Sequence, residues 1–169
     1  MGIWDWLTGA EDEPPAPAEE LSTAPTQTDI GAALESVTAL VSDPAVPGPV
    51  RARALTVIET VRQTLPRLGL LGLGSYDAYS VVATATDYLP EAIGGYLRLP
   101  RDWADSRPVE GGKTALLILI DQLDLLGATM DAIYDAANTT DAAALITHGR
   151  FLQEKFGHNQ APELNLGPS

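Results

Sequence analysis

Apolar side chains recur every three or four residues over most of the chain after Asp29, which is the spacing of one face of a helix. The first such run follows Thr28, a residue type that caps helix N-termini, and it stops at Pro44, which cannot continue a helix. The pattern therefore predicts a first helix that begins near Asp29. Its apolar positions are Ile30, Ala33, Leu34, Val37, Leu40 and Val41.

Prolines and a serine mark the next predicted helices. The run over 49–65 has a proline in its first turn, where proline is favoured, and ends at Pro66. Ser75 is a suitable N-cap for a third helix that runs toward Tyr88. Pro90 then either kinks this helix or starts a short successor.

The longest predicted helix spans 113–138, after a Gly-Gly pair and an irregular segment over 100–110. A last helix is expected to start at Thr140 or Asp141 and to end at Phe156. At about 100° per residue, one broad arc of the longest helix is apolar, so we expect this helix to be the centre of the core. The arc contains Leu116, Leu119, Ile120, Leu123, Leu126, Met130, Ile133, Tyr134 and Ala137.

The pattern as a whole predicts an all-α fold, because no strand-like alternation of useful length occurs. We expect an irregular bundle of five to six helices over 29–157. Residues 9–28 hold five acids and four prolines, a composition that favours a disordered acidic tether. Residues 1–8 form a separate tryptophan-bearing peptide, and 158–169 are predicted to be a flexible tail.

Charge changes the picture of possible partners. The net charge is −13, and the first 50 residues contain nine acids and no Lys or Arg. Nucleic acid and anionic lipid surfaces would repel such a chain, so we expect no nucleic acid partner and regard a membrane as an unfavourable one. The chain has no cysteine and no evident secretion signal, which fits a cytoplasmic protein.

Four aspartates line one edge of the longest predicted helix, within about 80° of one another. They are Asp121, Asp124, Asp131 and Asp135. This stripe is either a solvated acidic face or a site for a cation or a basic partner. Short carboxylates on one helix enclose an ion poorly, and neither His148 nor His158 belongs to a Glu-x-x-His pair, so we predict no metal site.

Signatures of catalysis are weak. The segment around Gly111-Gly112-Lys113-Thr114 suggests a phosphate loop, but Arg107 stands where that motif needs a glycine. The sequence also lacks a Gly-x-Ser-x-Gly elbow. We therefore predict no catalytic residues and no cofactor, and we regard an enzyme as the less favoured class.

The segment 96–103 is rich in the residue types that dominate protein interfaces, namely Tyr96, Arg98, Arg101 and Trp103. One interpretation is a partner-binding loop. The other is a loop that seals itself onto the bundle, with Trp103 packed inward and an arginine paired to an acid.

The N-terminal peptide carries Ile3, Trp4, Trp6 and Leu7, which form helical pairs if the peptide folds on a groove. Two tryptophans offer large apolar surfaces that favour burial. The groove belongs either to a protein partner or to this chain's own bundle. The acids that flank the peptide disfavour a lipid surface, and Trp6 stands where a myristoylation signal needs Ser or Thr.

Residues 87–100 read DYLPEAIGGYLRLP, a Tyr-Leu-Pro segment followed by a second Tyr. This segment resembles the XpaC-like helical family, which is named for 5-bromo-4-chloroindolyl phosphate hydrolysis and is associated with toxic-anion resistance proteins. The resemblance covers about a third of the chain, from Tyr88 through the longest helix. It implies a bacterial, helical accessory protein in a stress response, and it transfers no catalytic residues.

Two functions follow as hypotheses. The first is a non-enzymatic adaptor that binds a protein partner through the N-terminal Trp peptide and through the Arg/Trp segment. The second is a hydrolase or ligand-binding helical protein linked to toxic-anion stress. Homo-oligomerisation through apolar helix faces is a further expectation.

Overall fold

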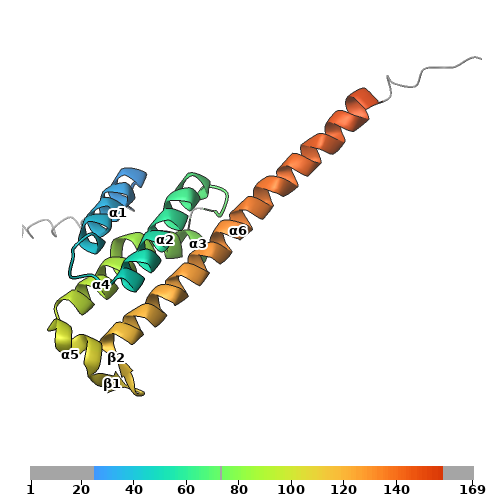
Figure 1. Ribbon diagram of the computed structural model, residues 1–169. Coiled ribbons are helices and arrows are strands. Elements are labelled where there is room, and N and C mark those ends of the chain that lie inside the picture. Colours follow the sequence, from blue (N-terminus) through green and yellow to red (C-terminus); the bar gives the residue numbers. More distant parts are fainter. Residues whose placement is uncertain (1–24, 73, 158–169) are drawn as a thin grey trace, which may run out of the picture.

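The computed structural model describes residues 25–72 and 74–157 and confirms the all-α class (Figure 1). The predicted Trp peptide over 1–8, most of the predicted tether over 9–28 and the predicted tail over 158–169 lie outside these residues. In the described ranges, no helix combines the length and the apolar character that a membrane crossing requires.

Helix α1 (Gln27–Val41) starts two residues before the predicted position, and its cap is Thr26 rather than Thr28. The Thr26 hydroxyl accepts a hydrogen bond from the Asp29 amide at 3.2 Å, and the Asp29 carboxylate accepts one from the Thr26 amide at 2.8 Å. This reciprocal capping box satisfies two amides that the helix cannot pair. Hydrogen bonds from the Thr26 hydroxyl and amide also lower the pKa of Asp29.

Helix α2 (Gly48–Thr64) has Pro49 in its first turn and continues into a short 3-10 turn, η1 (Leu65–Arg67). Arg51 fixes the connection between α1 and α2. Its side chain donates to the Val41 carbonyl at 2.9 Å and to the Asp43 carbonyl at 3.0 Å. Val46, in the same connection, is buried, so the prolines and this arginine together turn the chain back on itself.

Helix α3 (Tyr76–Ala83) is capped by Ser75, as predicted, and it does not end before Pro90. A π-helical turn, η2 (Thr84–Tyr88), joins it to α4 (Leu89–Leu97), in whose first turn Pro90 stands. Proline lacks an amide hydrogen and clashes with the preceding turn, which accounts for the departure from α-helical pairing at this point.

Residues 100–110 are more regular than the sequence suggested. They contain α5 (Arg101–Ser106) and strand β1 (Pro108–Glu110), which pairs antiparallel with β2 (Lys113–Thr114). Gly111 and Gly112 form the turn of this hairpin, with φ of 55° and 77°, a conformation that glycine adopts readily. The strands are too short to leave an alternating pattern, so the hydrophobic pattern did not indicate them, and the all-α class holds.

The largest correction concerns α6 (Ala115–Phe156), which is one helix of 42 residues rather than two. The predicted break at Thr140 does not occur. The hydroxyls of Thr139 and Thr140 bond back to the carbonyls of Asp135 and Ala136, at 2.9 and 3.1 Å, instead of capping a new helix. Thr114 caps the true N-terminus of α6.

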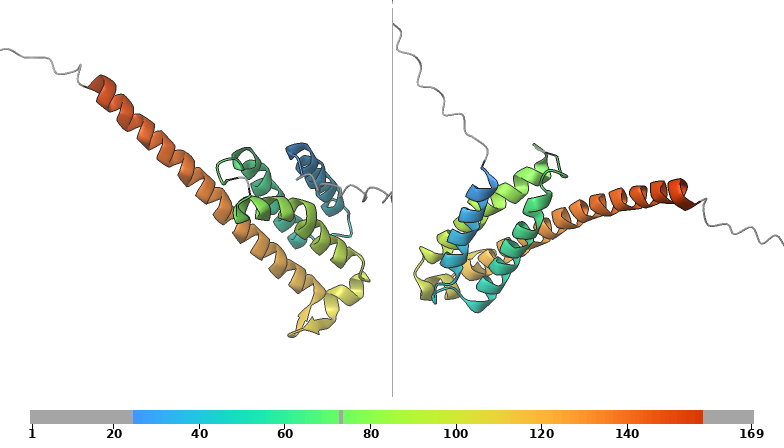
Figure 2. Two further views of the ribbon diagram at one scale, coloured as in Figure 1. Left: turned by 180° about the vertical axis from the view of Figure 1, so that it is seen from behind. Right: turned by 90° about the horizontal axis from the view of Figure 1, so that it is seen from above.

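The first half of α6 packs along α2 and α4, while α1 packs on α2, η2 and α4 (Figures 1 and 2). The core is a single cluster in which α6 contributes Leu119, Leu123, Met130 and Ile133. The second half of α6 extends beyond the other helices as a free rod, which both views of Figure 2 show.

Candidate interaction surfaces

The acidic edge of α6 faces neighbouring elements. Arg53 of α2 pairs with Asp124 at 2.7 Å, the Thr60 hydroxyl donates to Asp131 at 3.2 Å, and Lys113 of the hairpin pairs with Asp121. These aspartates therefore help to align α2 and the hairpin with α6. Among the described residues, no three His, Cys, Asp or Glu side chains gather closely enough to hold a metal ion.

Two of the four predicted Arg/Trp-segment residues meet around Asp105. The Tyr96 hydroxyl donates to Asp105 Oδ1 at 2.6 Å, and Arg101 Nε donates to Asp105 Oδ2 at 2.8 Å. The Arg101 guanidinium also lies 5.8 Å from the centre of the Tyr96 ring. Tyr96 is only 5% exposed, so its ring and hydroxyl fasten α5 to α4.

The other two residues lie apart from this cluster. Trp103, on α5, remains 41% exposed. The Arg98 side chain lies over Gly94 and Gly95, with guanidinium nitrogens 3.6 and 3.7 Å from where a Cβ would stand at each glycine. The structure thus joins Tyr96 with Arg101 and leaves Trp103 available at the surface.

Burial and the hydrogen bond to Asp105 raise the pKa of Tyr96 to about 12. Because the unfolded value is near 10, the resulting stabilisation is present below about pH 10 and is lost as the pH rises through 12. In an ultraviolet titration of tyrosinate, we expect a late step near pH 12 that Tyr96→Phe removes and that Asp105→Asn moves to lower pH. A late step that persists in Tyr96→Phe would belong to another residue, for which Tyr88 is a candidate because the neighbouring Tyr79 hydroxyl raises its pKa.

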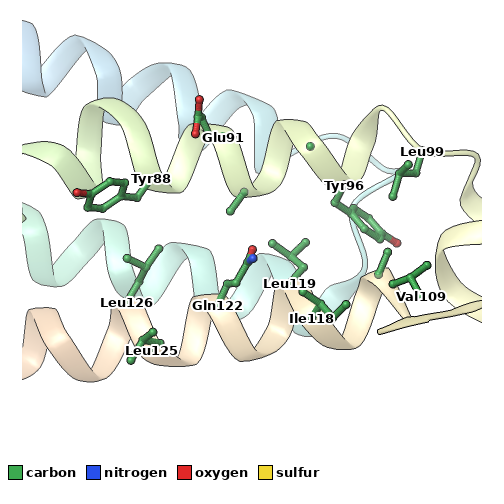
Figure 3. Close-up of a pocket in the computed structure, with 13 residues that line it drawn as sticks. Tyr88, Glu91, Tyr96, Leu99, Val109, Ile118, Leu119, Gln122, Leu125 and Leu126 are labelled. Atoms are coloured by element: carbon green, nitrogen blue, oxygen red, sulfur yellow. The ribbon is translucent and has the colours of Figure 1, made fainter. Parts of the chain in front are cut away.

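An apolar groove of about 510 Å³ runs between α4 and the first half of α6. Figure 3 shows Leu119, Gln122 and Leu126 rising from α6 between the two helices, with Tyr88 at one end and Tyr96 at the other. Val109 of the hairpin closes the second end. Small residues on α4, Ala92 and Gly95, leave the space that the groove occupies.

Leu125 forms an apolar ridge along this groove and is 69% exposed. A second hollow beside it shares Ile118, Gln122 and Leu125 with the groove and is bounded by Glu110 and by the ion pair of Lys113 with Asp121. Ile118 and Leu125, which both hollows share, form an apolar strip between them. Because Glu91 lies on the α4 wall, carboxylates stand on both sides of this strip. Sequence reasoning missed this surface, although the apolar Ile118 and Leu125 outside the predicted core arc were a usable signal.

Exposed tyrosines continue the surface at the Tyr88 end of the groove. Tyr88 is 44% exposed, and Tyr79 and Tyr76 on α3 are 60% and 80% exposed. Tyrosine combines a large apolar ring with a hydroxyl and is enriched in protein interfaces.

The second half of α6 is a separate surface. Every residue from Thr139 to Gly157 is exposed. The large apolar side chains in this stretch are Leu145, Ile146, Phe151, Leu152 and Phe156. The sequence predicted a helix here but gave no reason to expect that it leaves the bundle.

Comparisons with protein-family models, with curated proteins and with solved structures found no match. The resemblance to the XpaC-like family therefore stays a prediction.

Proposed function

We propose that this chain is a non-enzymatic cytoplasmic adaptor whose groove between α4 and α6 binds an amphipathic helix of a partner protein. The observation that carries the proposal is the groove itself, an apolar channel parallel to two helices with an exposed leucine along its edge. Grooves of this kind receive helices that insert apolar anchors at spacings of three and four residues.

The lining of the groove favours binding over chemistry. In the part of the chain that the structure describes, Glu91 is the single carboxylate that lines the groove, and no lysine, arginine or histidine lines it. General acid-base catalysis needs a titratable group within reach of a reacting atom and tuned by its neighbours. An apolar floor with Gln122 as a polar group is better suited to hold a side chain in one orientation.

Charge selects the partner. Glu91 and Glu110 border the strip, while Asp121 is paired with Lys113, so the border keeps an acidic excess that would attract a bound helix with basic residues beside its apolar anchors. The chain's own N-terminal peptide carries Asp5 and is followed by an acidic stretch, so it has the wrong sign for this groove. The proposal therefore assigns Ile3, Trp4, Trp6 and Leu7 to a second partner in trans.

Leu125→Glu tests the groove. A carboxylate on the ridge would place a charge in the path of the partner's apolar anchors, and we expect at least a tenfold loss of the partner in affinity purification from the source cells. Leu125 is 69% exposed, so the variant should fold normally, which far-ultraviolet circular dichroism checks.

The matched control is Leu117→Glu, the same exchange on the same helix. Leu117 is 47% exposed and lines none of the hollows described above. This variant should retain the partner. Equal capture by both variants and the native chain would refute the groove as the binding site, and a chain without residues 1–8 tests the Trp peptide separately.

A further inference from the structure

The part of α6 from Thr139 to Gly157, called the distal segment below, has no other helix beside it within residues 25–72 and 74–157 (Figure 2). Thr139, Thr140, Thr147 and Gly149 are weak helix formers, and helical order in water usually depends on packing of an apolar face. The distal segment has such a face, which the described residues leave uncovered.

This face is a stripe with alternating spacings of three and four residues. It consists of Ala142, Leu145, Gly149, Leu152 and Phe156. At about 100° per residue these positions fall within about 80°, which is the seam of a two-helix coiled coil. Leu145, Leu152 and Phe156 are 72%, 40% and 63% exposed.

The stripe continues the side of α6 that α2 covers in the bundle. Gly127 and Tyr134 occupy the same arc; Gly127 faces Val57, whose methyl lies 3.8 Å from its would-be Cβ, and Arg67 lies 5.7 Å from the Tyr134 ring. The cover ends where Arg67 pairs with Asp141 at 3.2 Å. Beyond that pair, no described residue occupies the position along α6 that α2 fills in the bundle.

We infer that the distal segment of a second copy of this chain packs against this uncovered stripe. The two distal segments run antiparallel to each other. In this register each large side chain meets a small or short one: Leu145 faces Gly149 of the second copy, Leu152 faces Ala142, and Phe156 faces Asn138. Alternation of large and small side chains is what lets two helices approach closely. A parallel pair would instead place Gly149 against Gly149 and leave a void.

Charge favours the same arrangement. In the antiparallel register Asp141, which already pairs with Arg67, comes near Lys155 of the second copy, and this contact occurs twice by symmetry. The distal segment is also locally neutral, since Asp141 and Glu154 balance Arg150 and Lys155, whereas the whole chain carries −13. Two copies therefore repel each other least here.

The length of the stripe favours a second distal segment over the N-terminal peptide as its partner. The stripe from Ala142 to Phe156 spans about 21 Å of helix, whereas the apolar residues 3–7 cover little more than one turn. The distal segment of a second copy has the same length as the stripe, because the two chains are identical. One helix pair of this size is a small interface, so we expect a dissociation constant in the micromolar range.

Sedimentation equilibrium of the full chain from about 1 to 300 µM tests the inference. We expect a monomer-dimer equilibrium that Leu145→Glu with Leu152→Glu shifts at least tenfold toward monomer. Phe151→Glu is the control, because Phe151 is 51% exposed on the same segment but lies about 140° from the centre of the stripe. It should dimerise like the native chain.

Cysteine pairing reports the orientation, since the native chain has no cysteine. A mixture of Ala142→Cys and Leu152→Cys chains should form the mixed disulfide under mild oxidation, and neither variant should link to itself efficiently. Self-linkage of Leu152→Cys without the mixed product would mean a parallel pair and would overturn the register.

A chain that stays monomeric up to 300 µM, or a dimer that survives the double glutamate exchange, overturns the inference. Neither result affects the groove, because Leu145 and Leu152 lie outside it. Conversely, loss of partner capture by Leu125→Glu leaves the dimer unchanged, so the two proposals fail independently.

Discussion

Leu123→Ala is expected to lower the free energy of unfolding by about 3 kcal/mol, the usual cost of removing a buried leucine side chain from a packed core. Leu123 is 1% exposed and lies in the middle of the packed half of α6. The loss combines the removed apolar burial with the cavity that the rigid neighbours leave. Urea denaturation followed by circular dichroism measures it as a lower midpoint with an unchanged slope.

Leu125→Ala provides the matched comparison two residues away. Because Leu125 is 69% exposed on the groove ridge, its truncation should change stability by no more than about 0.5 kcal/mol. If both variants lost equal stability, the assignment of Leu123 to the core and of Leu125 to the surface would be wrong.

Ala132→Pro is expected to destabilise the whole bundle strongly. Ala132 is exposed, so the proline ring meets no neighbour across the core, but it removes a backbone hydrogen bond and clashes with the previous turn. This costs about 3 kcal/mol or more, and the kink would displace the buried Met130 and Ile133 as well. The measured result is a large drop in the thermal midpoint.

Ala143→Pro makes the same exchange at another exposed alanine of α6, beyond the bundle. We expect it to reduce the helical signal of the distal segment while the thermal midpoint of the bundle stays within a few degrees of the native value. A large fall in that midpoint would show that the distal segment supports the bundle. A sharp independent transition for residues 139–157 would contradict the single continuous α6.

The sequence predicted best those helices that have a capping residue or a first-turn proline at their ends. Proline in the first turn of α2 and Ser75 before α3 both have direct physical roles at those positions. The start of α1 was wrong by two residues because Thr26 and Thr28 are equal as residue types. Only Thr26 has Asp29 three residues later to complete a capping box.

Other features depend on contacts that local patterns do not encode. A threonine pair caps a helix or bonds back within one, and Thr139 and Thr140 do the second, so the predicted break disappears. The Gly-Gly pair directly precedes the helix predicted over 113–138, but it forms the hairpin turn, and the helix begins at Ala115. In both cases the residue types permitted two local structures.

The candidate surfaces show the same division. The sequence singled out Tyr96 by composition, yet whether its hydroxyl faces solvent or Asp105 depends on the position of α5. The groove joins α4 residues to α6 residues that lie 19 or more positions further along the chain, so no single segment reveals it. The N-terminal Trp peptide remains a prediction outside the described residues.

Because α6 is one continuous helix, the direction in which its distal stripe faces depends on the number of residues between the bundle and the stripe. Each added residue turns everything beyond it by about 100° and advances it by about 1.5 Å. One residue inserted after Ala137 would point the apolar stripe away from the α2 side, whereas seven would move it outward by about 10 Å and turn it by only about 20°. The length of α6 therefore determines both how far the stripe lies from the bundle and which way it faces. Insertions of seven residues, about two turns, lengthen the helix while nearly keeping the direction of the stripe.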